Sequence, residues 1–253
     1  MQTGQVPAMK SSQEPSHEIR KNLISVVMPY WRRQRALLVN VENYSRLYDD
    51  EDVEMIVVDD GSPEPAVVPA GLPIMVTVLR LPKKFAALNP CVPINKGVAV
   101  SRGEFVVLTN PEVIHRDSIL DEMRLRLVDM GPKGYIAAAC RGRKWWYCHS
   151  TLMPEPSSVG RAPCPEGAGL HFCAMLHRSL FDEIGGFTEA YREGQGYEDS
   201  DFLWKLDRAG AKFAICDDFV TDHVECPGSS WPDGGAARNK AIFNAAWPSH
   251  AAI

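Results

Sequence analysis

Acidic side chains stand at three places where an apolar stretch of the chain gives way to a turn or a new element. Asp59 and Asp60 follow EMIVV, Glu112 follows EFVVLTNP, and Glu198 and Asp199 precede SDFLWKL. Carboxylates placed in this way can bind a hard divalent cation or take a proton from an attacking hydroxyl. They can equally be structural, because Asp-Gly-Ser is a common turn and acidic residues commonly begin helices. The elements around them decide between these roles.

Strands and helices alternate through the first half of the chain. Short apolar runs predict strands over 23–30, 54–58, 73–81 and 104–110, and helical periodicity predicts helices over 32–48, 95–103 and 118–130. This alternation is typical of an α/β fold with parallel strands, whose ligands bind beyond the carboxyl ends of the strands. The sequence therefore predicts that loops 29–33, 59–62 and 110–112 surround one crevice.

The second half has a different texture. A strand is predicted over 135–142, a strand and helix over 169–187, a helix over 197–210 and a last strand after it, with His223 in the loop that follows. Residues 143–169 are rich in aromatic residues, proline and glycine without a clear period, which is typical of a segment that lines or covers a site. The first 22 residues are polar and are expected to form a flexible tail.

The composition is that of an ordinary globular protein, with 45% hydrophobic and 23% charged residues and a net charge of −5. This acidity disfavours a nucleic-acid acceptor without excluding one. The seven cysteines form no CxxC pair and predict reduced thiols. We see no run long enough to span a membrane and no signal peptide, so the expected compartment is the cytoplasm.

Five motifs, in this order, resemble the GT-A fold nucleotide-sugar glycosyltransferases of inverting family 2. They are VVMPYWRR, IVVDDGSPEP, NKGVAVSRGEFVVLTNPEV, GAGLHFCAMLHRSLFDEIGGFTEAY and GYEDSDFLWKLDRAG. The resemblance covers residues 23–225 and implies a Rossmann-like, mostly parallel sheet flanked by helices. It also implies one domain over 23–253, with a nucleotide-binding half over 23–112 and an acceptor and catalytic half over 113–253.

Carried over onto this sequence, the resemblance implies a donor nucleotide site. Its expected residues are Pro29, Arg33, Asp59, Asp60, Ser62, Asn95 and Asn110. The family's metal-binding DxD motif stands here as Asn110-Pro111-Glu112, which implies Glu112 as a ligand of Mn²⁺ or Mg²⁺. His223 matches the position of a second ligand, and an imidazole suits Mn²⁺ better than Mg²⁺. An ordinary loop histidine is the alternative.

The resemblance implies Asp199 as the general base that deprotonates the acceptor hydroxyl, with Glu198 hydrogen-bonding the acceptor or orienting the base. Both could also cap a helix. Sugar or acceptor contacts are assigned to Ala168, Gly169, Trp145 and Trp146, although aromatic clusters often serve packing. The last stretch, 226–247, is interpreted as a mobile lid or as a surface tail packed by its tryptophans.

The sequence therefore predicts a metal-assisted inverting transfer of a sugar, with a UDP-sugar as the favoured donor, to an acceptor hydroxyl on a saccharide or another molecule. Two alternatives stay open. A protein of this fold that binds nucleotide-sugars without turnover is one, and the altered Asn110-Pro111-Glu112 motif is compatible with it. A nucleotidyltransferase is the other, although VVMPYWRR lacks the glycine-rich phosphate loop expected of that class.

Overall fold

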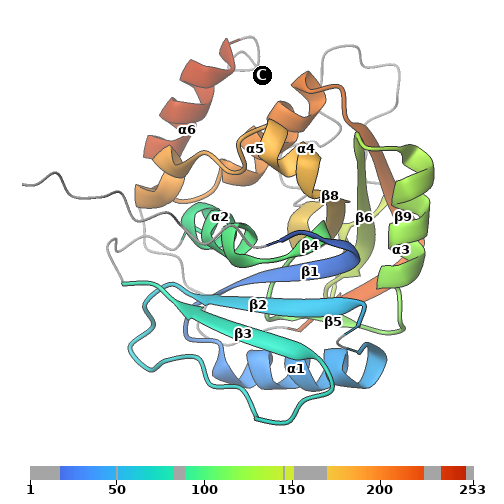
Figure 1. Ribbon diagram of the computed structural model, residues 1–253. Helices are drawn as coiled ribbons and strands as arrows, with labels where there is room; N and C mark the ends of the chain where they lie inside the picture. The colour runs from blue at the N-terminus through green and yellow to red at the C-terminus, as the bar shows by residue number, and fades with distance from the viewer. Residues whose placement is uncertain are drawn as a thin grey trace, which may run out of the picture.

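A single nine-stranded sheet organises the protein in the computed structural model, which describes residues 18–49, 51–82, 89–144, 146–150, 170–224 and 235–248 (Figure 1). The strands are β1 Arg20–Tyr30, β2 Val53–Asp59, β3 Met75–Arg80, β4 Gly103–Thr109, β5 Val113–His115, β6 Gly134–Arg141, β7 Trp146–Cys148, β8 Cys173–His177 and β9 Lys212–His223. Their order is β3-β2-β1-β4-β8-β6-β9-β5, with β7 paired to β6.

Helices cover both faces of this sheet. They are α1 Gln34–Leu47, α2 Cys91–Val100, α3 Leu120–Met130, α4 Arg178–Glu183, α5 Glu198–Arg208 and α6 Gly235–Ala246, with short 3₁₀ turns at Leu170–Phe172 and Glu189–Glu193. Figure 1 shows α1 on one side of the parallel strands and α2 on the other. Because both faces are covered, every residue of β2 is buried, as a central parallel strand requires.

The sheet divides into two parts, which correspond to the first and second halves of the sequence. Strands β3, β2, β1 and β4 are parallel to one another, whereas β8 is antiparallel to both β4 and β6. Strand β9 then runs parallel to β6, and β5 pairs antiparallel with β9. The predicted α/β class, with its mostly parallel sheet, is confirmed.

Some elements differ from the sequence prediction, and His223, predicted in a loop, is the last residue of β9. Strand β1 begins at Arg20, inside the predicted tail, because Arg20 N donates to Arg102 O at 2.8 Å and Asn22 N donates to Glu104 Oε2 at 2.9 Å. Helix α2 begins at Cys91 instead of Asn95. Strand β5 has only three residues and was not predicted, since so short a run carries no period of its own.

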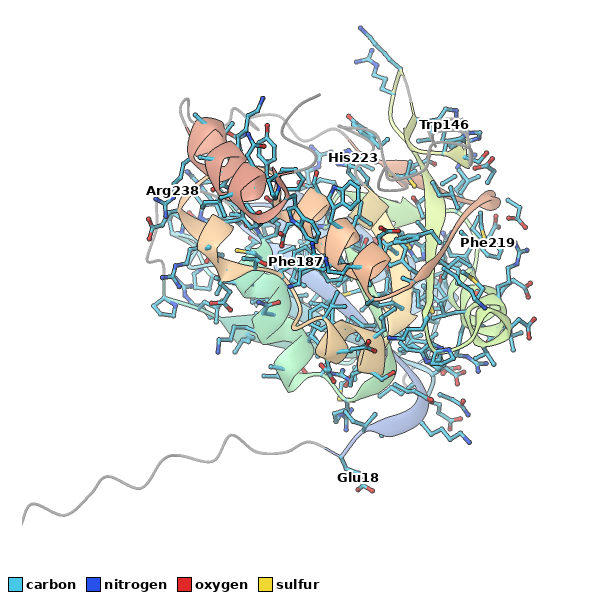
Figure 2. The ribbon with its side chains drawn as sticks, turned by 90° about the horizontal axis from the view of Figure 1, so that it is seen from above. Glu18, Trp146, Phe187, Phe219, His223 and Arg238 are labelled. Atoms are coloured by element: carbon cyan, nitrogen blue, oxygen red, sulfur yellow. The ribbon has the colours of Figure 1, made fainter. Side chains whose placement is uncertain are left out.

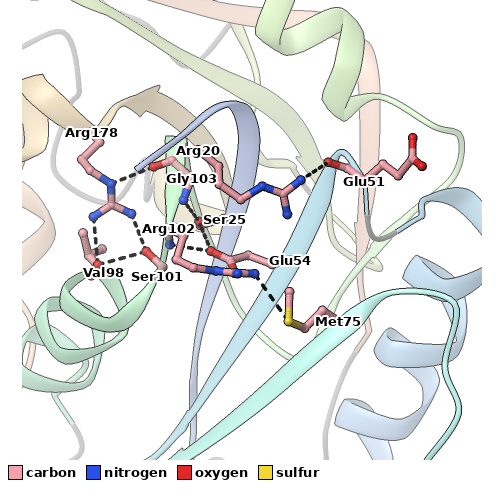
Figure 3. A network of polar contacts seen from close by, with 10 residues as sticks. All are labelled: Arg20, Ser25, Glu51, Glu54, Met75, Val98, Ser101, Arg102, Gly103 and Arg178. Carbon is pink, nitrogen blue, oxygen red and sulfur yellow. Dashed lines mark hydrogen bonds and ion pairs between the residues drawn. The ribbon is translucent and has the colours of Figure 1, made fainter. Parts of the chain in front are cut away.

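A polar network ties the amino ends of β1, β2 and β4 together (Figure 3). Ser25 Oγ donates to the buried Glu54 carboxylate at 2.7 Å and accepts from Gly103 N at 2.7 Å. Arg102 adds two hydrogen bonds of 3.1 Å to the same carboxylate. A side chain at Gly103 would meet Ser25 Oγ at 2.5 Å, so only glycine allows this contact.

Arg178, at the start of α4, closes the same network from the other side. Its buried guanidinium donates to Gly103 O at 2.7 Å, to Val98 O at 2.9 Å and to the Ser101 hydroxyl. These acceptors lie at the end of α2 and the start of β4, so one side chain fixes the helix against the strand. This network accounts for the Ser-Arg-Gly-Glu sequence between the two elements in structural terms.

The described cysteines agree with the sequence prediction. Cys91, Cys140, Cys148, Cys173 and Cys216 are all buried and carry free thiols. Among the helices that the structure describes, none is long and apolar enough to cross a bilayer.

Candidate functional site

A cleft of about 620 Å³ opens beyond the carboxyl ends of β1, β2 and β4. Of the residues predicted for the site, eight line it: Pro29, Arg33, Asp60, Asn110, Glu112, Glu198, Asp199 and His223. The loops after three parallel strands thus face the start of α5 and the end of β9 across one cavity. This is the crevice that the strand order predicts.

The loop after β1 places Arg33 on the cleft wall. Arg32 adopts a left-handed backbone with φ of 54°, and its N–H donates to Ser62 Oγ at 3.0 Å, which fixes the loop against the turn after β2. Arg33 Nε then donates to Glu112 Oε1 at 2.6 Å. The predicted metal ligand is therefore already paired with a guanidinium from another loop.

The two carboxylates of the Asp-Asp-Gly-Ser turn after β2 lie in different surroundings. Asp59 is fully buried, and its oxygens accept from Ser62 N at 2.8 Å and Ala66 N at 3.1 Å. Arg80 Nη1 stands 3.7 Å from the same carboxylate. Asp59 and Ser62 thus shape the turn and do not line the cleft, whereas Asp60 does.

Asn95 is also structural. Its side chain donates to Phe187 O at 2.9 Å and accepts from Phe187 N at 2.9 Å, and it donates to Glu189 Oε1 at 3.2 Å. The Asn-Lys-Gly motif therefore binds α2 to the turn that leads into the 3₁₀ segment Glu189–Glu193. Asn95 does not line the cleft, so we leave it, with Asp59 and Ser62, out of the donor contacts proposed below.

Glu112 directly precedes β5, and His223 ends the neighbouring strand β9. Val113 pairs with His223 across β5 and β9, and Val224 N donates to Glu112 O at 2.8 Å. Both side chains line the cleft, so they offer one carboxylate and one imidazole to a ligand there. Across the described residues no cluster of three or more His, Cys, Asp or Glu side chains suits a metal ion.

Glu198 and Asp199 open α5 after a strained turn. Gly196 and Tyr197 both have positive φ, 69° and 68°, which is costly for tyrosine and turns the first helical residues toward the cleft. Glu198 Oε2 accepts from Asn89 Nδ2 at 2.7 Å. Burial, and next the Asp199 charge, raise the pKa of Glu198 well above the usual range.

The carboxyl of Asp199 also has a raised pKa, because the enclosing walls desolvate it. Its side chain nevertheless keeps 43% of its surface exposed toward the cleft. The carboxylate is therefore accessible to a substrate and easier to protonate than an ordinary aspartate. Since the two neighbours interact, they titrate as a pair.

His171 lies behind Asp199 and was not singled out from the sequence. Its Nδ1 is 2.7 Å from Tyr135 OH, and its Nε2 is 3.8 Å from Asp199 Oδ1. Burial lowers the pKa of His171 to about 4, so the ring is neutral at neutral pH. When Tyr135 donates to Nδ1, the ring proton is on Nε2 and faces the aspartate. A single histidine 28 positions before Asp199 gave no sequence signal, since only the fold joins them.

Aromatic rings form one side of the cleft. The His223 ring lies 4.9 Å from Tyr147 and 5.5 Å from Phe172, centroid to centroid. Trp146, predicted to contact the acceptor, lines an adjoining pocket that shares His223 with the cleft; Figure 2 labels both residues on the same side of the molecule. The predicted contacts Trp145, Ala168 and Gly169 lie outside the described residues.

The last helix packs onto the protein. Asn239 Nδ2 donates to Tyr191 O at 3.1 Å and Gly196 O at 2.8 Å, and Trp247 Nε1 donates to Asp201 Oδ1 at 2.9 Å. Trp247 is 6% exposed, so the described part of this stretch, 235–247, is packed against the protein, as the second interpretation expects. It supports the turn that carries the acidic pair.

Comparison with known proteins identifies the family of this chain. A sequence model of the family described as "Glycosyl transferase family 2" matches residues 25–185. A protein of Haemophilus influenzae described as "Uncharacterized glycosyltransferase" is 24% identical over 189 residues, which are 73% of this chain and 62% of that protein. The chain thus spans about three fifths of that relative's length.

Solved structures share the fold at low identity. TarS 1–349 of S. aureus in complex with UDP-GlcNAc gives a TM-score of 0.65 at 15% identity, covering 88% of this chain and 71% of that one. The mannosyltransferase PcManGT of Pyrobaculum calidifontis, in complex with GDP-Man and Mn²⁺, gives 0.61 at 18% identity, covering 85% and 60%. With the family match extending over more than half of its length, this chain belongs to glycosyl transferase family 2.

Proposed function

We propose that this chain transfers a sugar from a nucleoside diphosphate sugar, with a UDP-sugar as the favoured donor, to an acceptor hydroxyl with inversion at the anomeric carbon. One observation carries the proposal: a single cleft is lined by Asp60, Asn110 and Glu112 and also by Asp199. A single displacement needs the donor and the base in one cavity, because attack comes from the side opposite the leaving diphosphate. Structures of similar fold that hold UDP-GlcNAc or GDP-Man support this donor class.

In the proposed reaction Asp199 takes the proton of the acceptor hydroxyl. The hydroxyl oxygen then bonds to the anomeric carbon as the bond to the diphosphate oxygen breaks. Glu198, fixed by Asn89, orients the acceptor beside the base. Arg33 provides positive charge on the donor side of the cleft, where negative charge grows on the leaving diphosphate.

A divalent cation fits the donor side of the cleft. Glu112 and His223 would hold it, with phosphate oxygens of the donor completing the coordination, and the imidazole favours Mn²⁺ over Mg²⁺. A bound cation supplies charge that stabilises the leaving diphosphate. The Arg33 guanidinium already paired with Glu112 supplies charge at the same place, so metal dependence is a question for experiment.

The cytoplasmic location stays a prediction.

Nucleotide binding is tested first, by thermal unfolding with UDP, GDP, CDP, dTDP and their sugars, with and without Mn²⁺. A ligand at a hundredfold excess over Kd stabilises the folded state by about 2.7 kcal/mol, or roughly 5–10 °C for a domain of this size. The shift should be largest for UDP and should shrink in Glu112→Ala. No shift with any nucleotide would refute the donor site.

Turnover is tested by release of the nucleoside diphosphate from its sugar. Asp199→Asn should lower turnover by about 10²–10⁴-fold and leave the nucleotide-induced thermal shift unchanged. Wild-type binding without any turnover would favour the binding-protein alternative instead. Equal turnover in wild type and Asp199→Asn would refute the assignment of the base.

A further inference from the structure

A second pocket, of about 420 Å³, adjoins the cleft and has no role in the reaction described above. Six side chains line it: Arg141, Arg143, Lys144, Trp146, Asp222 and His223. Three of them are cations and one is a carboxylate, in a protein whose net charge is −5. We refer to it as the basic pocket. Its charge is opposite to that of the whole chain.

The only carboxylate of the basic pocket's described lining is already neutralised. Asp222 accepts two hydrogen bonds from Arg116, at 2.7 and 2.8 Å, and a third from Arg141 at 3.2 Å. These contacts hold the pKa of Asp222 below its usual range, so it stays charged and committed to arginine. The positive charge of the remaining cations is therefore not cancelled by Asp222.

The fold, and not a chance approach of side chains, builds this pocket. Arg141 pairs with Asp222 across β6 and β9 and with Trp146 across β6 and β7. The ion pair between Arg141 and Asp222 joins β6 to β9. Arg141 keeps further N–H donors for a ligand because a guanidinium has five. Arg143 and Lys144 extend from the turn between β6 and β7, where both are exposed.

The basic pocket adjoins the cleft through one shared residue, His223. Tyr147 lines the cleft and Trp146 lines the basic pocket, as expected for neighbours that point to opposite faces of a strand. His223 lines both cavities and is the wall between them. None of the donor loops after β1, β2 and β4 lines the basic pocket. Of the residues assigned above to the donor side only His223 reaches this pocket, so we assign a group bound there to the acceptor instead of the nucleotide.

We propose that the basic pocket binds a phosphate group of the acceptor, so that the natural acceptor carries a phosphate near the hydroxyl that receives the sugar. Arginine side chains match the oxygens of phosphate with paired N–H donors, and a lysine adds a mobile charge. This inference rests on the proposed transferase function, because only a transferase has an acceptor. The binding of phosphate itself needs no turnover.

The experiment measures binding of two probes to the full chain with UDP present in excess. Inorganic phosphate, followed by tryptophan fluorescence, represents a small phosphorylated acceptor. A dye-labelled single-stranded oligonucleotide, followed by anisotropy, represents a polymer of phosphodiesters. Tighter binding of one probe identifies which kind of acceptor the pocket serves.

The variant Arg143→Gln/Lys144→Gln removes two exposed cations and should leave folding intact. The double variant should bind the probe about tenfold more weakly near 50 mM salt. It should also reduce the slope of log K against log salt for the oligonucleotide by about 1.4. The control Lys21→Gln/Arg46→Gln removes the same charge from exposed residues that line neither cavity and should bind as wild type.

Three outcomes would overturn the proposal. They are no binding of either probe to the wild type, equal binding by wild type and variant, and weaker UDP binding by the variant, which would assign the pocket to the donor. Failure of the transferase proposal is a separate result, because it appears as the absence of a UDP-induced thermal shift in the wild type.

Discussion

Replacing Gly97 by alanine tests how closely α2 packs on the sheet beneath the cleft. A Cβ at this position would stand 2.5 Å from Val27 Cγ1 and 2.9 Å from Val58 Cγ2. Both valines are fully buried on β1 and β2, and a β-branched side chain has few other rotamers available. The helix would have to move outward, and Pro93 in its first turn and Pro90 just before it line the cleft.

Two effects of opposite sign set the magnitude. Alanine favours a helix over glycine by about 1 kcal/mol. Overpacking a rigid core costs about 1–3 kcal/mol, and two approaches below 3.0 Å put this site at or above the top of that range. We therefore expect a net loss of about 2 kcal/mol in the free energy of unfolding, or roughly 4–8 °C in Tm.

Urea unfolding followed by circular dichroism measures this loss, with the exposed neighbour Lys96→Ala as a control that changes only the helix surface. The UDP-induced thermal shift should also decrease in Gly97→Ala, because the cleft wall moves. A variant stabilised by about 1 kcal/mol would mean that helix propensity prevails and that the packing argument is wrong.

Other predictions concern the buried polar groups. Arg178→Met removes three hydrogen bonds to buried acceptors and should lower the free energy of unfolding by at least about 3 kcal/mol in urea titrations, with Arg178→Lys intermediate. The raised pKa of Glu198 favours the folded state at low pH and loses that contribution as pH rises through the folded value, so Glu198→Gln should gain stability over wild type only as pH increases. Turnover should rise with pH through the raised pKa of Asp199, and an acid limb near pH 4, as for an ordinary aspartate, would contradict this. His171→Phe should lower kcat and shift that limb while leaving the donor KM unchanged, with Tyr135→Phe showing a smaller effect; an unchanged profile would leave His171 a packing residue.

The acidic motifs show where sequence reasoning reached its limit. In Asp59-Asp60 two identical side chains stand side by side, yet one is buried within its own turn and the other faces the cleft. A motif gives residue types and spacing, but the direction of each side chain depends on hydrogen bonds from residues farther along, such as Ala66 N. The bonds of Asn95 were hidden for the same reason, because its partner Phe187 is distant in sequence.

The short strand β5 and the last helix α6 also could not be predicted from local sequence patterns. Strand β5 exists because β9 pairs with it, and α6 is held by Asn239 and Trp247 against residues of the preceding turn and helix. The ion pair between Arg33 and Glu112 joins two loops that meet only when β1 and β4 lie side by side. None of these contacts leaves a periodic pattern in the residues that make it.

The sequence by itself determined the fold class, the alternation of elements and the cleft at the carboxyl ends of the strands, because apolar periodicity and turn residues are local properties. Tertiary structure alone decided which acidic side chains reach that cleft, the pairing of Arg33 with Glu112 and the placing of His171 behind Asp199. Each of these depends on the meeting of distant segments, which burial of the common core brings about and which no local pattern encodes.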